Sequence, residues 1–289
     1  MNTLKQKLEG DEILVAPGIY DLISVKLADR MGFDCLYMTG FGSVASYLGL
    51  PDAGLASYTD MLNRVSAFCG ASSTPIICDG DTGYGGLLNV AHTVQGYERA
   101  GAAGIQLEDQ EFPKKCGHTR GRRVTSAQDM VKKLRVAAES RSSSDFLIVA
   151  RTDARSSLGL DEALRRAEQY AKAGADVLFI ESPESEKELE IIGRSFDLPL
   201  LVNIVEGGRT PQLTPQELQS LGFSLAIYPV AGLLAAVQAL QKAYAPILAR
   251  RGTRELEGKD LYPFEELCLL MGFQKVWDFD ARHAEDSAK

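Results

Sequence analysis

Residues 75–108 read PIICDGDTGYGGLLNVAHTVQGYERAGAAGIQLE, and this stretch decides which fold class the chain can adopt. It begins with a short apolar run, Pro75–Asp79, and ends with a second one, Gly104–Glu108. Between them, Val90–Ala100 carries apolar residues at helical spacing, and Gly101 follows where glycine commonly ends a helix. Short runs that are nearly continuous in apolar residues are typical of parallel strands buried on both faces. The stretch therefore predicts a β–α–β unit.

The same alternation recurs along the chain. Eight apolar runs are predicted to be strands: Ile13–Pro17, Cys35–Thr39, Pro75–Asp79, Gly104–Glu108, Phe146–Arg151, Val177–Glu181, Leu200–Ile204 and Ser224–Tyr228. Each is followed by an amphipathic segment that is predicted to be helical: Leu22–Met31, Tyr58–Cys69, Val90–Ala100, Ala127–Ser140, Asp161–Ala173, Glu186–Ser195, Pro215–Leu221 and Leu233–Arg250. Eight such units predict an α/β fold, a (β/α)₈ TIM-type barrel. A doubly wound sheet in two halves is the alternative, which the absence of a hinge-like boundary disfavours.

The expected domain organisation follows from this pattern. Residues 1–252 are expected to form the barrel, which is the catalytic domain. Residues 253–289 show helical character around Pro263–Met271 and are too many for a loose end. We expect this C-terminal segment to be a helical extension that packs on a neighbouring subunit.

Composition excludes several classes of protein. The 289 residues include 39 acidic and 31 basic side chains, and the net charge of −8 argues against binding to nucleic acid or to anionic membranes. With 45% hydrophobic residues, the chain can bury enough apolar area to fold. The N-terminal residues are charged, the apolar stretches are too short to span a membrane, and the five cysteines are scattered. These features predict a cytoplasmic enzyme.

Acidic side chains stand where predicted strands end. In (β/α)₈ enzymes the active site lies at the carboxyl ends of the strands. Asp79 and Asp81 lie two apart in an extended segment, so they project to one side, and Glu108 ends the next strand. Such oxygen donors suit Mg²⁺ or Mn²⁺ better than zinc. The alternative, that each acid caps a following helix, is weaker for the set than for any one member.

A basic segment, KKCGHTRGRR at residues 114–123, follows the strand that ends at Glu108. Cys116 is flanked by lysines, and His118 follows two residues on, so the surrounding positive potential is expected to lower the pKa of the thiol. A thiol of this kind can donate or accept a proton near neutral pH. Long connections inside compact domains are often lids over active sites. The alternatives are a solvated basic loop and, less well supported, a nucleic-acid patch.

Residues 40–45, GFGSVA, resemble the glycine fingerprint of dinucleotide-binding proteins, and Asp60 lies at a plausible distance for a ribose contact. This pattern makes an NAD-dependent oxidoreductase the sharpest competing hypothesis. However, it follows the second predicted strand instead of the first, and it leaves the carboxylates and the cysteine segment unexplained. The oxidoreductase is therefore the weaker interpretation.

Taken together, these motifs resemble the isocitrate lyase/phosphoenolpyruvate mutase superfamily. The likeness extends from Ala16 to Pro229 and is carried by four segments: 78–85, 108–110, 114–118 and 150–154. The Lys-Lys-Cys-Gly-His motif points to the lyase branches of the superfamily. The resemblance implies a barrel whose last helix is exchanged with a neighbour in a homotetramer, with Mg²⁺ or Mn²⁺ at the strand ends.

The resemblance also implies roles for individual residues. Asp79 and Asp81 match metal ligands, Glu108 matches the outer coordination sphere, and Asp52 matches a partner held through water. The candidate catalytic residues are Cys116, Tyr37 and Glu108. The implied substrate contacts are Thr39, Gly40, Phe41, Gly117, His118, Arg151, Glu181 and Asn203.

The implied reaction is a retro-aldol or retro-Claisen cleavage of a 2-hydroxy dicarboxylate. The bond between C2 and C3 breaks, Arg151 and Asn203 hold the developing negative charge, and Cys116 delivers a proton to C3. The base that removes the hydroxyl proton stays open among Tyr37, Glu108 and a metal-bound water.

One difference from the family pattern narrows the range of candidate substrates. Methylisocitrate lyases carry an arginine shortly after the Tyr-Pro pair of the last strand, whereas Leu234 stands at that position here. An apolar side chain would leave a third carboxylate buried without a partner, which is unfavourable, and would accommodate a methyl group instead. The favoured substrate is therefore 2,3-dimethylmalate, giving pyruvate and propionate. The alternatives are 2-methylisocitrate, with Arg209 as a compensating charge, and the reactions of carboxyphosphonoenolpyruvate mutase and oxaloacetate hydrolase.

Overall fold

The computed structural model describes residues 3–117, 119, 121–256 and 261–284. The chain divides into two compact units, one that extends to Leu233 and one that begins at Leu234. The first unit holds every strand among the described residues, and the second is helical. None of the described helices is long and apolar enough to cross a membrane.

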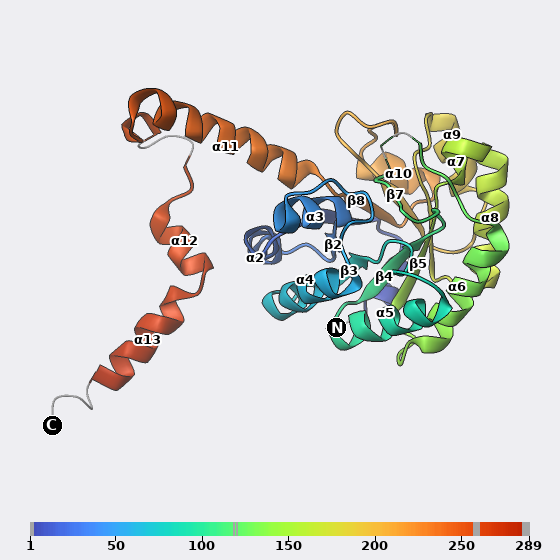
Figure 1. Cartoon of the computed structure of the whole chain (residues 1–289), viewed down its shortest axis with the longest axis horizontal. Helices are drawn as coiled ribbons and strands as arrows, with labels where there is room; N and C mark the ends of the chain where they lie inside the picture. The colour runs from blue at the N-terminus through green and yellow to red at the C-terminus, as the bar shows by residue number, and fades with distance from the viewer. Residues whose placement is uncertain (1–2, 118, 120, 257–260, 285–289) are drawn as a thin grey trace. The chain divides into compact units, whose positions relative to one another are not determined.

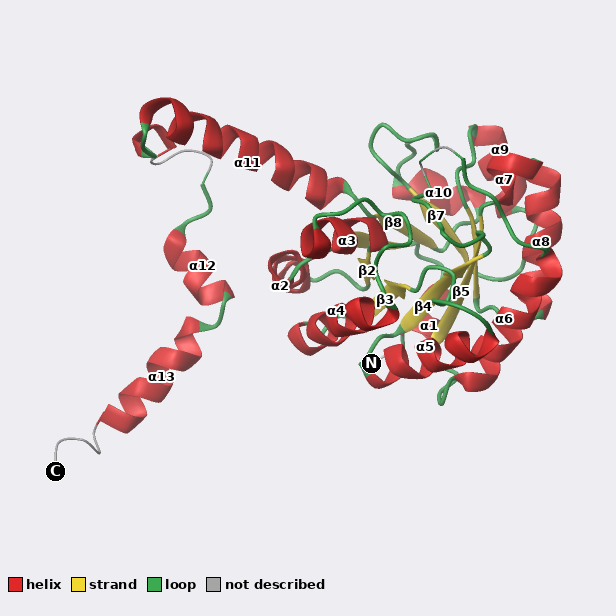
Figure 2. Cartoon of the chain, viewed as in Figure 1, coloured by secondary structure: helices red, strands yellow, loops and turns green. Residues whose placement is uncertain are grey.

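The first unit is a closed barrel of parallel strands paired in sequence order, with β1 closing onto β8. The strands are β1 (Leu14–Ile19), β2 (Leu36–Met38), β3 (Ile76–Asp79), β4 (Gly104–Glu108), β5 (Leu147–Thr152), β6 (Val177–Ile180), β7 (Leu200–Asn203) and β8 (Leu225–Tyr228). Helices surround the strands, as Figures 1 and 2 show. The predicted (β/α)₈ fold class is confirmed.

The helices of the first unit lie between successive strands, except for α1, which precedes β1. They are α1 (Leu4–Leu8), α2 (Leu22–Met31), α3 (Gly40–Leu48), α4 (Tyr58–Ala71), α5 (Leu87–Arg99), α6 (Ala127–Ser140), α7 (Ala154–Leu158), α8 (Leu160–Lys172), α9 (Glu186–Gly193) and α10 (Pro215–Leu221). Most begin at a residue whose side chain accepts a hydrogen bond from the first turn, such as Asp21, Ser57 and Thr214. The sequence did not predict the short helices α1, α3 and α7.

Alternation along the strands sorts the apolar side chains into two clusters. Leu36, Met38 and Cys78 belong to a cluster that also contains helix residues, so they face the helical layer. Tyr37 and Ile77, one position along, belong to the second cluster, which fills the barrel interior. Leu4 and Leu8 of α1 join this inner cluster, so α1 closes one end of the barrel. The interior is therefore a packed core, and ligands must bind beyond the strand ends.

The second unit contains most of α11 (Ala231–Arg250), the 3₁₀ turn Arg254–Leu256, α12 (Phe264–Leu270) and α13 (Phe273–Ala284). Neither α12 nor α13 has a buried residue. Large apolar side chains are exposed on these helices, among them Tyr244, Phe264 and Trp277. The predicted packing of residues 253–289 on a neighbouring subunit stays a prediction.

Candidate active site

The last inward-facing residue of several neighbouring strands is polar. Asp79 ends β3, Glu108 ends β4, Arg151 lies near the end of β5, Glu181 follows β6, and Asn203 ends β7. All five are buried. Charged side chains usually stay at the surface, so burial of four of them together is unusual. For Asp79, Arg151, Glu181 and Asn203 the residue two positions earlier belongs to the inner apolar cluster, and for Glu108 it is the buried Gln106. The barrel therefore aims these side chains toward one region above its core.

Arg151 lies among carboxylates. Its Nε and Nη2 donate to the two carboxylate oxygens of Asp153, both at 2.9 Å. Glu108 and Glu181 each have an oxygen 3.4 Å from the guanidinium, and the guanidinium stacks over the ring of Phe179. Burial alone would lower the pKa of Arg151, but these carboxylates raise it above its usual range. Arg151 is therefore a permanently charged group, with its orientation fixed on several sides.

The ammonium of Lys114 lies between two more carboxylates. Its Nζ is 2.6 Å from Oδ1 of Asp52 and 2.5 Å from Oδ1 of Asp81. Burial raises the pKa of Asp81 to about 7, with Lys114 opposing and the negative charges of Asp79 and Asp52 adding to the increase. The lysine thus neutralises only part of the negative charge at this position.

Glu108 bears on whether a cation fits this cluster. Its Oε1 is buried and has no hydrogen-bond partner, and burial raises the pKa of its carboxyl well above the usual value. Gly40 approaches the same region so closely that a Cβ there would lie 2.5 Å from Oδ2 of Asp79. The oxygen donors of Asp52, Asp79, Asp81 and Glu108 have the chemistry that Mg²⁺ or Mn²⁺ prefers. They fit such an ion chemically.

The side chains are not arranged around an ion in this structure. Among the described residues, no group of three or more His, Cys, Asp or Glu side chains could hold a metal as it stands. Lys114 instead contacts two of the predicted metal partners directly. Ion binding would therefore require at least a shift of this lysine.

Tyr37 belongs to a hydrogen-bonded chain that leads to Asp79. The Tyr37 hydroxyl donates to Oε1 of Gln106 at 2.6 Å, and Nε2 of Gln106 donates to Oδ1 of Asp79 at 3.2 Å. Burial, followed by the negative charge of Asp79, raises the pKa of Tyr37 well above its usual value. The phenol is therefore a protonated hydrogen-bond donor near neutral pH, which makes it a poor candidate for a general base.

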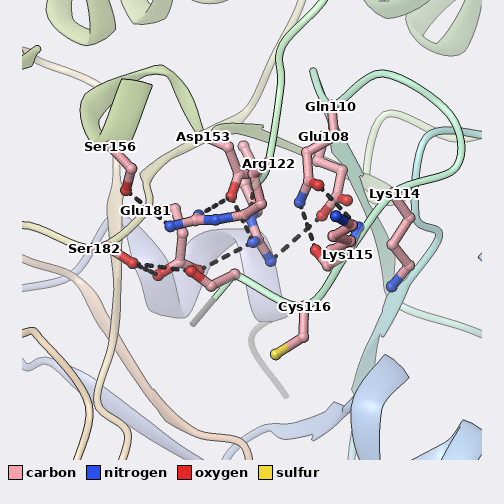
Figure 3. Close-up of polar contacts among 12 residues, drawn as sticks. Glu108, Gln110, Lys114, Lys115, Cys116, Arg122, Asp153, Ser156, Glu181 and Ser182 are labelled. Atoms are coloured by element: carbon pink, nitrogen blue, oxygen red, sulfur yellow. Dashed lines mark hydrogen bonds and ion pairs between the residues drawn. The ribbon is translucent and has the colours of Figure 1, made fainter. Parts of the chain in front are cut away.

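The cysteine segment lies close to this cluster (Figure 3). The backbone N–H of Cys116 donates to the carbonyl of Asp52 at 3.2 Å. A Cβ on Gly117 would lie 2.3 Å from Nη2 of Arg151, so only glycine lets the segment approach the arginine this closely. The hydroxyl of Ser182, a residue with a positive φ of 59°, contacts both the carbonyl of Gly117 and the carboxylate of Glu181. His118 lies outside the described residues, and the expected lowering of the Cys116 pKa stays a prediction.

The GFGSVA stretch has a packing role in the structure. Thr39 is the N-cap of α3, and its side chain accepts from the N–H of Gly42 at 3.5 Å. A Cβ on Gly42 would lie 2.7 Å from Cβ of Tyr20, so this glycine lets α3 approach β1 and leaves no room for a pyrophosphate. The carboxylate of Asp79, which lies beside Gly40, would also repel a pyrophosphate group. Phe41 follows in the first turn of α3 and is half-buried.

Leu234 does not belong to this part of the molecule. It is the first residue of the second unit and is exposed. Its predicted role in substrate selection is not tested by the contacts of the barrel and stays a prediction.

Several functional candidates were missed in the sequence. Arg122, from the end of the basic segment, pairs with Asp153 and donates to Ser156 at 2.8 Å. The sequence indicates Lys114 only as a charge beside Cys116, yet it is buried and makes two ion pairs. It predicts Gln106 only as a strand residue, whereas the Gln106 amide links Tyr37 to Asp79. The acidic Asp153, directly after Arg151 and Thr152, was the one available signal that the arginine has a local partner.

The fold and the site first define a class: a (β/α)₈-barrel enzyme with buried carboxylates and an arginine beneath a cysteine-bearing segment. The profile of the family described as phosphoenolpyruvate phosphomutase matches residues 4–248. The chain therefore belongs to the PEP mutase/isocitrate lyase superfamily, which confirms the resemblance seen in the sequence.

Individual relatives cover nearly the full chain. It is 44% identical to 2,3-dimethylmalate lyase of Eubacterium barkeri, covering 98% of this chain and 99% of that protein. It is 39% identical to 2-methylisocitrate lyase of Aeropyrum pernix, covering 99% and 91%.

Solved structures agree with these relatives. A crystal structure of 2,3-dimethylmalate lyase has a TM-score of 0.90 at 35% identity, covering 98% of this chain and 96% of that one. Oxaloacetate acetylhydrolase in complex with 3,3-difluorooxalacetate has a TM-score of 0.92 at 35% identity, with the same coverage. A phosphonopyruvate hydrolase solved with oxalate and Mg²⁺ has a TM-score of 0.87 at 30% identity, covering 97% and 98%.

The pairing of Asp153 with two arginines gives a testable prediction. Asp153→Asn keeps the shape of the side chain but removes the charge that Arg151 and Arg122 share. Breaking a buried ion pair costs about 3–5 kcal/mol, so urea unfolding followed by circular dichroism should show a loss of that size at pH 7. Asp197→Asn, at an exposed position, is the control and should change stability by less than about 0.5 kcal/mol. An Asp153→Asn protein as stable as the wild type would contradict the assigned pairing.

Proposed function

We propose that this protein is a Mg²⁺-dependent carbon–carbon lyase that cleaves a 2-hydroxy dicarboxylate. The observation that carries the proposal is the fixed, buried Arg151 beside a set of carboxylates that Lys114 only partly neutralises. A dicarboxylate brings two negative charges, so it needs both a cationic contact and a metal to enter such an acidic site. The similarity to 2,3-dimethylmalate lyase and 2-methylisocitrate lyase supports the same reaction class.

Asp79 and Asp81 would hold the ion, with Glu108 and Asp52 acting through water. When bound, Mg²⁺ supplies a Lewis acid for the hydroxyl and the adjacent carboxylate of the substrate. The unpartnered Oε1 of Glu108 supports its role as an acceptor for such water.

The remaining steps fall to the chain's own side chains. Arg151 binds the carboxylate at C3 and stabilises the negative charge that develops when the bond between C2 and C3 breaks. Asn203, whose Nδ2 donates to the carboxylate of Glu181 at 3.1 Å, would help Arg151 to hold this developing charge. Cys116 donates its thiol proton to C3, and the ketone at C2 is released as part of the first product.

Tyr37 acts as a hydrogen-bond donor that holds Gln106 and, through it, Asp79. Its raised pKa keeps the proton on the phenol, so the candidates for the hydroxyl base are Glu108 and a water molecule beside the ion.

The preferred substrate is 2,3-dimethylmalate, which would yield pyruvate and propionate. The support comes from the sequence, which has Leu234 at the position where methylisocitrate lyases carry an arginine for a third carboxylate. Arg209, the other candidate for that charge, is exposed and lies 3.4 Å from Glu184. The similarity to oxaloacetate acetylhydrolase makes oxaloacetate the second substrate to test.

The experiment is a steady-state assay of purified protein with Mg²⁺ against 2,3-dimethylmalate, 2-methylisocitrate and oxaloacetate. Pyruvate is followed by coupled oxidation of NADH, and oxalate by chromatography. We expect kcat/KM for 2,3-dimethylmalate to exceed that for 2-methylisocitrate at least about 10-fold, because the third carboxylate of 2-methylisocitrate would be buried without a basic partner. Chelation should abolish turnover and added Mg²⁺ should restore it. Faster cleavage of 2-methylisocitrate would contradict the substrate preference inferred from Leu234. Oxalate as the main product would contradict the proposed lyase activity.

The same assay tests Cys116. Cys116→Ser should lower kcat at least about 100-fold, because a hydroxyl is a much weaker acid than a thiol for delivering the proton. Cys268→Ser, in the second unit, is the matched control and should retain activity. Full activity of Cys116→Ser would remove the thiol from the mechanism.

We further propose that the chain is a homotetramer in which the second unit packs on a neighbouring subunit. The exposed apolar side chains of α11, α12 and α13 support this assembly, because an apolar surface of this kind is unusual on a monomer. Sedimentation equilibrium should give the mass of four chains, and a stable monomer would contradict the proposal.

A further inference from the structure

Gln110 lies at the base of the connection that carries Cys116. It follows β4 by two residues, it is 2% exposed, and it forms an isolated antiparallel bridge with Val124. On either side of this bridge, the N–H of Glu111 donates to Arg123 at 2.8 Å and that of Thr125 donates to Asp109 at 2.8 Å. The two ends of the connection are thus tied together, and Gln110 stands on a rigid stem.

The side chain of Gln110 pairs with the backbone of Lys115 at two points. Its Oε1 accepts from the Lys115 N–H at 3.0 Å, and its Nε2 donates to the Lys115 carbonyl at 2.8 Å. Only one orientation of the amide satisfies both bonds, because a backbone N–H only donates and a carbonyl only accepts. The pairing resembles one rung of a β-ladder, and Figure 3 shows both contacts.

Lys115 is held through its backbone, while its side chain is exposed and reaches the carbonyl of Gly121 at 3.4 Å. Its two neighbours both contact Asp52. Lys114 is buried between Asp52 and Asp81, and the N–H of Cys116 donates to the carbonyl of Asp52. Fixing the backbone of residue 115 therefore fixes where the residues before and after it can place their side chains.

We propose that Gln110 is a positioning residue that holds Cys116 and Lys114 in register with the ends of β3 and β4. The predicted effect on turnover rests on the proposed function. The pairing of the Gln110 amide with the Lys115 backbone, which we call the clamp, can be tested without substrate. Displacement of a reacting group by about 1 Å can cost a factor on the order of 100 in rate, so loss of the clamp should act mainly on kcat. Substrate binding should change little, since Arg151 and its partners do not depend on Gln110.

The experiment compares the wild type with Gln110→Leu, which removes both bonds at similar volume, and with Gln110→Asn, which keeps an amide that is one carbon too short. Each should lower kcat about 10- to 100-fold and change KM by less than about 3-fold. Gln216→Leu, the same change at an exposed position of α10, is the matched control and should retain wild-type kcat.

A second measurement does not depend on the reaction. Each full-length protein is treated with iodoacetamide, and alkylation of individual cysteines is followed by peptide mass spectrometry. Without the clamp, Cys116 should react at least about 3-fold faster, because local opening exposes it, while Cys268 serves as an internal reference. Gln110→Asn replaces Gln110→Leu if the latter does not fold.

The outcomes separate the two hypotheses. A wild type that cleaves none of the substrates refutes the proposed function, and faster alkylation of Cys116 in the variants would still support the clamp. Wild-type kcat together with an unchanged rate of Cys116 alkylation overturns the inference, as does an effect confined to KM.

Discussion

The site is organised by one electrostatic constraint: more carboxylates are buried at the strand ends than the basic side chains there can neutralise. Lys114 pairs with Asp52 and Asp81, and Arg151 pairs with Asp153, yet burial still raises the pKa of Asp81 to about 7. A buried charge without a partner is unfavourable, so a cation would stabilise this cluster. This excess of carboxylates is the reason for proposing a divalent ion.

The barrel makes the constraint possible because it separates stability from chemistry. The inner cluster below the strand ends contains only apolar side chains of the strands and of α1, together with Tyr37. Two residues further along several strands in the carboxyl direction, the inward positions change from apolar to polar, as from Ile77 to Asp79 and from Phe179 to Glu181. The packed core holds these charged residues at fixed positions, so each can keep an orientation that water would otherwise randomise.

Much of this arrangement could be predicted from the sequence, and the successes share a physical reason. Strands have a period of two and parallel strands end at the same edge, so Asp79, Glu108, Arg151 and Asn203 could be assigned to one region from local pattern alone. Asp81 does lie beside Asp79, because its N–H donates to Oδ1 of Asp79 at 3.0 Å. However, it lies in a turn with a positive φ of 49°, so the predicted extended conformation of this segment is wrong. Leu234 lies in a different unit, where no strand register applies.

The failures lie in connections. No periodic pattern reports which of two adjacent lysines faces inward, so Lys114 and Lys115 could not be distinguished. The contacts of Arg122 with Asp153 and of Gln110 with Lys115 depend on how a loop returns to its stem, and loop geometry has no comparable sequence signal. The glycines of residues 40–45 were open to a dinucleotide interpretation because close helix packing and phosphate binding both require glycine.

The most direct test of this account is a titration of the metal-free protein with Mn²⁺, monitored by electron paramagnetic resonance of the free ion. The account predicts one bound ion per chain, and affinity lowered at least about 10-fold in Asp81→Asn, with Asp197→Asn unchanged. Absence of binding to the wild type, or equal affinity in all three proteins, would show that the buried carboxylates do not form a cation site.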